Sequence, residues 1–358
     1  MQKVDYIIVG QGISGSCLAF ELIKRGKRVV VFDDNWHDAA CLVAAGVINP
    51  ITGQRLVKSW RSEIAHPYAR KFYVELEKQL GAKFFHDRKI LQLCRSQEES
   101  ELWQRRSLDS NYAAFMSDAS SSAGAFGKLN DKYGSHFIER SAWVEPPAVM
   151  EAFKVYLIAN SAIRCEKFDY SALHLTSTES SYKDLTFAGI IFADGWKVLE
   201  NPYFNWLPYR PAKGEILTLR SSIELPEHIV HRGGWIMKCG EQTFRIGSTW
   251  EREKLDSNPT ESAKIELLKL LKTMFVSEIE TEVVKHSAGV RPCTATTRPH
   301  LGVHPADNRI FSFNGFGSKG CALSPYFAKH FADYLLGNAE LDAEANLARH
   351  IRKFFRQK

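Results

Sequence analysis

The sequence has no C-x-x-C motif, and its cysteines are few and scattered. Disulfide frameworks and structural zinc sites use paired cysteines at regular spacing. His300 and His304 are flanked by prolines and are not expected to pair as ligands on one helix. We therefore expect reduced thiols, a cytoplasmic protein and no metal site. The 358 residues include seven cysteines: Cys17, Cys41, Cys94, Cys165, Cys239, Cys293 and Cys321.

Long apolar runs and a strong excess of one charge are also missing. Apolar runs such as residues 6–9 are far shorter than the roughly 20 residues of a membrane-spanning helix. The N-terminus has no basic segment followed by a long apolar run, so we expect no secretion signal. The net charge of +6 is too small to indicate nucleic-acid binding by itself. The balance of 44% hydrophobic and 25% charged residues is typical of a globular protein, and the length suggests about two domains.

The first clear motif is glycine-rich and follows an apolar, β-branched run at residues 4–9. Gly10, Gly12 and Gly15 form G-x-G-x-x-G, and a helical pattern follows over residues 16–25. In a dinucleotide site the first glycine permits the turn, the second lets a pyrophosphate approach, and the third lets the helix pack on the sheet. The free N–H groups of that helix, beginning near Ile13 and Ser14, would bind the phosphates.

A second apolar run at residues 29–32 ends in two acids, Asp33 and Asp34. A carboxylate at this point of a strand–loop–helix–strand unit accepts hydrogen bonds from ribose hydroxyls. An acid there also disfavours the 2′-phosphate of NADP. The complete unit predicts a Rossmann-type dinucleotide site, but this motif alone does not separate FAD from NAD.

A segment of small residues, Ala44-Ala45-Gly46, follows and turns at Asn49. Alone it is also compatible with ordinary tight packing. In this context the sequence resembles the D-amino-acid oxidase and glycine oxidase superfamily of FAD enzymes. The resemblance implies that this segment runs beneath the flavin ring. It also implies that Ala193 and Gly195, which directly follow an apolar strand at residues 185–192, pass close to FAD. The superfamily usually has a small residue where this chain has Asp194.

The middle of the chain has the patterns of a second domain. Alternating residues at 215–219, 235–237 and 243–249 predict a mostly antiparallel sheet with one face packed and the other lining a pocket. The polar run at residues 117–124 predicts an exposed loop. The fold class is therefore α/β plus α+β. We expect an FAD-binding domain at residues 1–86, 141–203 and 286–358, and a substrate domain at residues 87–140 and 204–285.

The C-terminal third resembles the closing segment of the same superfamily. Its motifs are Gly289-Val290-Arg291-Pro292, a strand at residues 310–313, and the loop Gly315–Gly320 before a helix. The resemblance implies that this loop approaches the flavin and that its helix N-terminus stabilises negative charge on the reduced ring. Gly315–Gly320 repeats the G-x-G-x-x-G spacing but lacks the early strand–helix unit of the N-terminal motif, so we expect it to serve the flavin and expect no nicotinamide domain. The candidate cofactor-binding residues are Gly10, Gly12, Ile13, Ser14, Gly15, Asp33, Asp34, Ala44, Ala45, Gly46, Ala193, Gly195, Gly317, Ser318, Lys319 and Gly320.

Arg291 is the candidate catalytic residue. In amino-acid oxidases the arginine of G-x-R-P binds the substrate carboxylate, because guanidinium offers two parallel N–H donors. The alternative is a structural arginine paired with an acidic side chain. Sarcosine oxidases tether flavin through a nearby cysteine, but Cys293 is offset from that position, so we expect non-covalent FAD. The candidate substrate-binding residues are Arg291, Trp235, Ser318, Lys319 and Asn49, and Arg55 and Lys58 are more typical of a solvated surface.

Two functions follow from the resemblance. The first is FAD-dependent oxidation of the C–N bond of a small amino acid or secondary amine, with hydride transfer to flavin N5 and hydrolysis of the imine. The alternative is removal of a carboxymethyl group from an aminomethyl uridine of tRNA, because Arg298–Gly302 and Gly317–Gly320 resemble the oxidase half of the bifunctional wobble-uridine enzyme. The basic residues of 349–358 would then contact phosphates. The patterns do not identify the amine, the electron acceptor or the oligomeric state.

Overall fold

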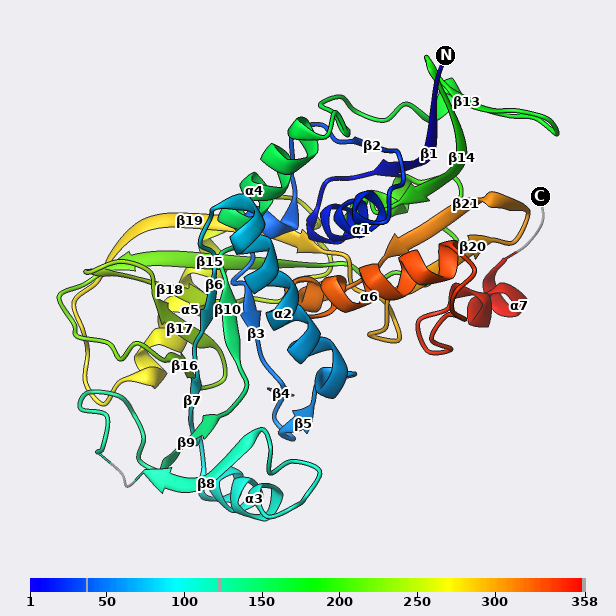
Figure 1. Cartoon of the computed structure of the whole chain (residues 1–358). Helices are drawn as coiled ribbons and strands as arrows, with labels where there is room; N and C mark the ends of the chain where they lie inside the picture. The colour runs from blue at the N-terminus through cyan, green and yellow to red at the C-terminus, as the bar shows by residue number, and fades with distance from the viewer. Residues whose placement is uncertain (37, 122–123, 356–358) are drawn as a thin grey trace.

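The computed structural model describes residues 1–36, 38–121 and 124–355, which form two large sheets with helices around them (Figure 1). The first sheet has a parallel core in the order β11–β2–β1–β14, and β21 pairs in parallel with the end of β14. Antiparallel strands extend it. Its strands are β1 (Gln2–Val9), β2 (Val29–Phe32), β11 (Ile163–Arg164), β12 (Leu173–Leu175), β13 (Ser180–Tyr182), β14 (Leu185–Phe192), β20 (His300–His304) and β21 (Asp307–Asn314).

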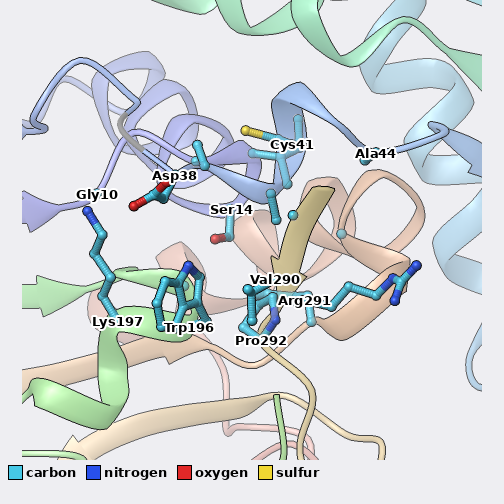
Figure 2. Close-up of a pocket in the computed structure, with 18 of the residues that line it drawn as sticks. Gly10, Ser14, Asp38, Cys41, Ala44, Trp196, Lys197, Val290, Arg291 and Pro292 are labelled. Atoms are coloured by element: carbon cyan, nitrogen blue, oxygen red, sulfur yellow. The ribbon is translucent and has the colours of Figure 1, made fainter. Parts of the chain in front are cut away.

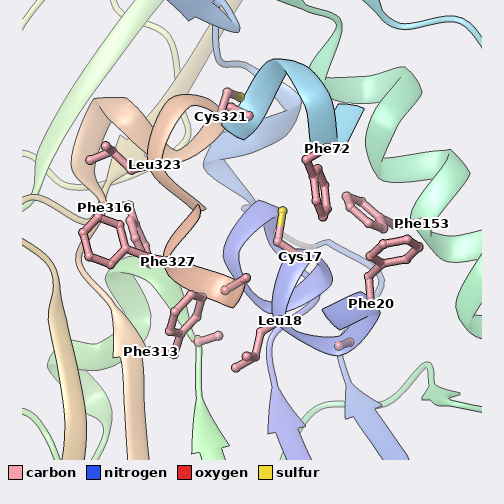
Figure 3. Packing of buried hydrophobic residues seen from close by; sticks show 14 of the residues in the cluster. Cys17, Leu18, Phe20, Phe72, Phe153, Phe313, Phe316, Cys321, Leu323 and Phe327 are labelled. Carbon is pink, nitrogen blue, oxygen red and sulfur yellow. The ribbon is translucent and has the colours of Figure 1, made fainter. Parts of the chain in front are cut away.

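Four helices pack around this sheet, because each presents apolar residues to a shared core. Helix α1 lies between α6 and α4 and is buried along most of its length, as Cys17, Leu18 and Phe20 in Figure 3 show. Phe327 of α6 and Phe153 of α4 belong to the same core. The helices are α1 (Ile13–Lys24), α2 (Ser62–Leu80), α4 (Pro146–Ala159) and α6 (Gly320–Leu335).

The second sheet is eight-stranded in the order β19–β15–β18–β17–β16–β7–β9–β8, and only the pair β16–β7 is parallel within the described residues. Helix α5 (Glu261–Met274) covers one face, where Leu267 and Leu271 pack against Leu217 and Ile246. The strands are β7 (Ile90–Leu93), β8 (Met116–Ser121), β9 (Ser135–Ile138), β15 (Ala212–Arg220), β16 (Ile229–His231), β17 (Trp235–Lys238), β18 (Thr243–Gly247) and β19 (Glu282–Arg291).

Smaller elements complete the fold, among them a three-stranded sheet in the order β3–β10–β6 and the pair β4–β5. Helix α3 precedes β8 at the far end of the second sheet (Figure 1). At the C-terminus, Phe355 packs against Trp206 and His304, which holds the short helix α7 against the first sheet. These elements are β3 (Val47–Ile48), β4 (Ile51–Thr52), β5 (Val57–Lys58), β6 (Phe85–Asp87), β10 (Ala142–Val144), α3 (Gln97–Ser107) and α7 (Ile351–Phe354).

The expected fold class is confirmed: a Rossmann-type sheet stands beside a mostly antiparallel one. The proposed domain boundaries stay a prediction, and β19 crosses one of them because it begins before residue 286 and ends after it. No helix in the described part of the chain is both long and apolar enough to cross a membrane.

The polar run at residues 117–124 was expected to be an exposed loop, and this prediction is wrong for residues 117–121. They belong to β8, the edge strand of the second sheet, which pairs with β9. Ladder hydrogen bonds to a neighbouring strand outweigh a polar composition that would otherwise favour a loop. Residues 122–123 lie outside the described residues.

Candidate active site

A cavity of about 360 Å³ runs between the two sheets, along the carboxyl ends of β1, β2 and β14. Figure 2 shows Asp38 and Lys197 toward one end, and the side chain of Arg291 extending toward the other, on the side of Ala44. Ligands of open α/β sheets bind outside the carboxyl ends of the strands, so this is the position expected for a dinucleotide. The volume lies in the range of small-molecule pockets, which is about 300–1,000 Å³.

The N-terminal glycine loop forms one wall of the cavity. Gly10 has φ +103°, and a methyl group on it would lie 2.6 Å from the carbonyl oxygen of Ala193. Gly15 lies behind the wall, where a methyl group would overlap the carbonyl oxygen of Gly10. A methyl group on Gly12, by contrast, would have no neighbouring atom within 4 Å. Gly12 is also the N-cap of α1 and supplies no side-chain cap, so the first N–H groups of the helix are available to an anion.

Asp33, at the end of β2, is fixed by the main chain around it. Its Oδ2 accepts from the N–H of Gln11 at 2.8 Å, and its Oδ1 accepts from the N–H of Trp36 at 2.6 Å. Burial raises the pKa of the Asp33 carboxyl above its usual value, although these hydrogen bonds oppose the shift. Asp34 pairs with Lys197 at 3.1 Å. A fixed carboxylate with remaining lone pairs toward the cavity suits ribose hydroxyls.

The Ala44–Gly46 segment reaches the cavity and is fixed by β10 of the small three-stranded sheet. Gly46 has φ +74°, and a methyl group on it would overlap the carbonyl oxygen of Val144. Trp143 Nε1 donates to the carbonyl of Ala45 at 3.0 Å. The segment therefore has a fixed backbone and small side chains, which is what close approach to a flat ring requires.

The second glycine loop forms the part of the cavity wall next to the start of α1. Gly317, Ser318 and Gly320 belong to the wall, and α6 begins at Gly320 without a side-chain cap. A methyl group on Gly320 would lie 2.9 Å from Ile13 Cγ2, so the starts of α6 and α1 are in contact. Two uncapped helix N-termini therefore face one cavity, and both favour negative charge.

Arg291, the last residue of β19, is partly buried and has only neutral hydrogen-bond partners. Its Nη2 donates to Ser248 Oγ at 2.8 Å, and both Nη atoms lie 3.4 Å from the carbonyl oxygen of Thr249. Among the described residues no carboxylate lies within 4 Å of it, whereas a structural arginine would normally pair with one. Burial lowers the pKa of the Arg291 guanidinium from its usual value. The site thus holds an uncompensated cation.

Not every candidate substrate residue reaches this cavity. Trp235 and Ser318 line it, but Asn49 and Lys319 are not part of the described wall. The side chain of Asn49 accepts from the N–H of Ile51 at 2.9 Å and so closes its own turn. Burial lowers the pKa of the Lys319 ammonium, and the neighbouring charge of Arg298 adds to the effect. Lys58 pairs with Glu63 on the surface, as a solvated role predicts.

Asp194 is partly buried at the cavity wall, at the position where the resemblance implied a small residue. It accepts from Asn201 Nδ2 at 2.7 Å and Asn314 Nδ2 at 2.8 Å. Burial raises its pKa to about 7, and these hydrogen bonds only reduce the shift. The flanking residues Ala193 and Gly195 line the cavity as expected.

Several residues of the site were missed because no local pattern places them at the cavity: some lie on strands of the second sheet, and others lie in loops after β2 and β11. Arg245 on β18 donates from Nη2 to the carbonyl of Val43 at 2.6 Å, which anchors the small-residue segment. Trp196 and Lys197 directly follow the motif residue Gly195, and this adjacency in sequence could have predicted that they line the cavity. The missed wall residues include Trp36, Asp38, Cys41, Lys167, Phe168, Tyr170, Trp196, Lys197, Glu200, Gly214, Ile216 and Ser248.

The cavity fits FAD on several independent features of this chain. Open space lies above Gly12, two uncapped helix N-termini face the space, and Asp33 stands at one end of it. Within the described residues no group of three or more His, Cys, Asp and Glu side chains is arranged to hold a metal ion. The fold and the cavity together define a flavin-dependent oxidoreductase.

Comparison with known proteins gives the family. The sequence model of the DAO family, described as FAD dependent oxidoreductase, matches residues 5–334, and this chain belongs to that family. It is an enzyme that uses FAD, and the resemblance stated from the sequence motifs is confirmed.

Three matches illustrate the relationship. Glycine oxidase from Bacillus licheniformis is 26% identical over 361 residues, which is 94% of each chain. The structure of glycine oxidase from Geobacillus kaustophilus has a TM-score of 0.81 at 21% identity, over 98% of this chain and 100% of that one. The tRNA 5-methylaminomethyl-2-thiouridine biosynthesis bifunctional protein MnmC from Marinobacter nauticus is 24% identical over 91% of this chain but 54% of its own length.

Proposed function

We propose that this enzyme oxidises the C–N bond of a small amino acid or secondary amine that carries a carboxylate. The observation that supports this most directly is the cationic Arg291 at the cavity wall, which has no acidic partner within 4 Å among the described residues. A buried cation without a counter-ion is costly, so an anionic substrate group would gain a large interaction there. The substrate of the relatives named glycine oxidase is an amino acid of this kind.

The chain's own residues would bind and orient the substrate. Arg291 would hold the carboxylate through two parallel N–H donors and so fix the adjacent C–N bond. Trp235 and Ile216, which line the same part of the cavity, would exclude water from the reacting carbon. FAD held by the loops at residues 10–15 and 317–320 would supply the two-electron oxidation of that bond, and hydrolysis of the resulting imine would give a carbonyl compound and an amine.

The surroundings of Arg291 suit an amine that binds in its neutral form. The wall residues from the second sheet include no acid and no histidine among those described: Gly214, Ile216, Trp235, Ser248, Gly289, Val290 and Arg291. An ammonium group would need a carboxylate there, whereas a neutral amine already has the lone pair that forms the C=N bond. We therefore assign no general base on this side of the cavity.

The experiment is anaerobic reduction of the bound flavin by a panel of amines, such as glycine, N-methylglycine, alanine and proline, in wild type and Arg291→Met. Each charge-assisted hydrogen bond lost contributes roughly 1.5–3 kcal/mol. Reduction by a carboxylate-bearing amine should slow by on the order of a hundredfold or more, with FAD content unchanged. Arg291→Lys keeps the charge but not the paired donors, and should recover part of the rate.

Two results would oppose the assignment. Loss of FAD or of folding in Arg291→Met would show that the residue is structural. Equal reduction rates in wild type and Arg291→Met, with an amine that does reduce the flavin, would show that the carboxylate binds elsewhere.

A second candidate is oxidation of a carboxymethylated aminomethyl uridine in tRNA. It is supported by the match to the bifunctional tRNA-modification protein, and by Arg352 and Lys353, which are exposed on α7 and have no acidic partner within 4 Å in the described part of the chain. Adding modified tRNA to the panel separates the candidates. Both use the same Arg291, because both substrates carry a carboxylate beside the C–N bond.

A further inference from the structure

The guanidinium of Arg291 lies between two residues that no motif identifies. On one side is Gly214 of β15, whose neighbouring strand is β19. A methyl group on Gly214 would overlap Nη1, Nη2 and Cζ of Arg291, so the guanidinium lies directly over the glycine. The indole of Trp250 also packs on this group, with its ring centroid 4.9 Å from Cζ.

The edge of the guanidinium is fixed by the segment that leads into Trp250. Ser248 Oγ accepts from Nη2 at 2.8 Å, and the carbonyl oxygen of Thr249 lies 3.4 Å from both Nη atoms. These partners are all neutral, so they orient the group and leave its charge uncompensated. Within the described residues, Nε and the second N–H of Nη1 make no hydrogen bond.

The backbone of β15 supports both sides of this arrangement. The N–H of Lys213 donates to the carbonyl of Glu251 at 2.7 Å, and the N–H of Glu251 donates back at 3.0 Å. The N–H of Glu215 donates to Thr249 Oγ1 at 2.9 Å. Residues 213–215 therefore position both Gly214 and the segment that carries Trp250, which makes the spacing between the two a property of the fold.

Trp250 is 51% exposed, which is unusual for the largest apolar side chain unless it serves a purpose at the surface. Arg252 lies over the same ring, with Cζ 5.8 Å from the centroid, and belongs to the surface. An indole face lowers the free energy of a cation and displaces water from it. Its contact with Arg291 is the one that reaches the cavity wall.

We propose that Gly214 and Trp250 form a slot that holds Arg291 ready for the substrate carboxylate, and that both are positioning residues for carboxylate recognition. This inference rests on the proposed function. A guanidinium held in one plane loses little freedom when it binds a carboxylate. Without the slot the same arginine would be a mobile and hydrated cation.

The test is binding of acetate to the holoenzyme, which is monitored through the change in flavin absorption. Acetate has the carboxylate but no amine to oxidise. Gly214→Ala should displace the guanidinium and weaken acetate binding by at least roughly tenfold, because small misplacements are costly at such sites. Trp250→Leu should weaken it by roughly fivefold to tenfold, and Trp250→Phe should recover most of the loss. FAD content should stay at the wild-type value in all three.

Two controls make the result specific. Arg252→Met removes the other cation from Trp250 and should leave acetate affinity unchanged. Gly214→Ala added to Arg291→Met should have no further effect, because the group that it displaces is gone; this non-additivity is not expected of a general disturbance of the fold. With an amine that reduces the flavin, the slot variants should raise KM more than they lower kcat.

The outcomes separate the inference from the function on which it rests. If wild type does not bind acetate, or if Arg291→Met binds it equally well, the proposed carboxylate site is wrong. If Arg291→Met loses acetate but Gly214→Ala and Trp250→Leu bind it like wild type, the slot is wrong and the proposed function stands. Weakening in Trp250→Phe equal to that in Trp250→Leu would also count against the aromatic contact.

Discussion

Arg245 on β18 donates from Nη1 to the main-chain carbonyl of Ala44 at 3.3 Å, and so joins the antiparallel sheet to the segment that lines the flavin cavity. Its Nη2 donates to the carbonyl of Val43 at 2.6 Å. Burial lowers the pKa of the Arg245 guanidinium, and no carboxylate within 4 Å compensates it among the described residues. The antiparallel sheet thus reaches the cofactor site through a charged group that bonds only to main-chain carbonyls.

Replacing Arg245 with Met should therefore affect stability and cofactor together. Two partly buried carbonyls lose their donors, and each unsatisfied group costs about 1–3 kcal/mol. We expect a lower midpoint in urea unfolding and weaker retention of FAD on dialysis. The lysine of Arg245→Lys can reach only one of the two carbonyls well. Its unfolding midpoint and FAD retention should therefore lie between those of wild type and Arg245→Met. Unchanged FAD affinity in Arg245→Met would show that residues 43–44 hold their position without it.

Gly12→Val should give apoprotein. The space above Gly12 is open, and a branched side chain would occupy the place where we expect the pyrophosphate. The backbone of Gly12 has φ −65°, which valine adopts readily, so folding should be retained. Flavin absorbance and far-ultraviolet circular dichroism of the purified variant measure the two effects. Full FAD occupancy in a folded Gly12→Val would remove the basis for placing the pyrophosphate at this loop.

Acid precipitation should release all the flavin. Cys293 is the cysteine nearest in sequence to Arg291, but it is not part of the described cavity wall and lies beside Gly317, where a methyl group would be 3.3 Å from Sγ. Burial raises the pKa of the Cys293 thiol, so little reactive thiolate is present near neutral pH. The measurement is flavin in the supernatant against flavin in the pellet. Yellow precipitate would indicate a covalent bond, and Cys293→Ser would then identify its site.

Stability should fall as the pH rises toward and past 7 because of Asp194. Its pKa is raised to about 7 in the folded protein, against roughly 4 for an unfolded chain. Folding therefore favours the protonated form, and this contribution is complete below the unfolded pKa and is lost as the pH rises through the folded one. The loss is on the order of 2–4 kcal/mol across that window.

The matched variant for this effect is Asp194→Asn, which keeps the shape without the charge. Unfolding is measured from pH 4 to 8 on protein stripped of FAD, so that loss of cofactor does not contribute. The difference between wild type and Asp194→Asn should grow in favour of the variant as the pH rises. A difference that does not change with pH would mean that Asp194 is ionised throughout.

The C-terminal helix gives the test that separates a tRNA substrate from a small one. Deleting residues from 349 onward would remove His350, which is buried against His300, so charge removal is the cleaner change. Arg352→Gln with Lys353→Gln should flatten the salt dependence of tRNA binding if these residues contact phosphates. Lys269→Gln with Lys272→Gln on α5 removes the same charge from another surface.

The expected result for a small substrate is equal tRNA binding in both double variants and unchanged flavin reduction by the amine. A salt slope that falls only in the α7 variant, with flavin reduction only by modified tRNA, would favour the second candidate function. The proposed role of Arg291 would be unaffected by that result.

Local chemistry was sufficient to predict much of this molecule from its sequence. The strand β14 has the predicted bounds, and Gly10, Gly12 and Asp33 line the cavity as the motif requires, because the whole unit is encoded within 33 consecutive residues. Helix α4 begins at Pro146, and proline is favoured in the first turn of a helix. The polar residues 117–121 were mispredicted because strand pairing with β9 is not a local property.

The sequence by itself determined the dinucleotide loop, the small-residue segment and the arginine of G-x-R-P, because each is a short run whose residue types carry the chemistry. Only the tertiary structure decided what surrounds that arginine. Gly214, Ser248 and Trp250 meet Arg291 through the register of β15 with β19 and with the segment after β18. Register depends on pairing across more than 70 residues of chain, as between Gly214 and Gly289, and no local pattern encodes it. Asn49 and Lys319, neighbours of the motifs in sequence, also lie outside the described cavity wall, although their place in the chain suggested otherwise.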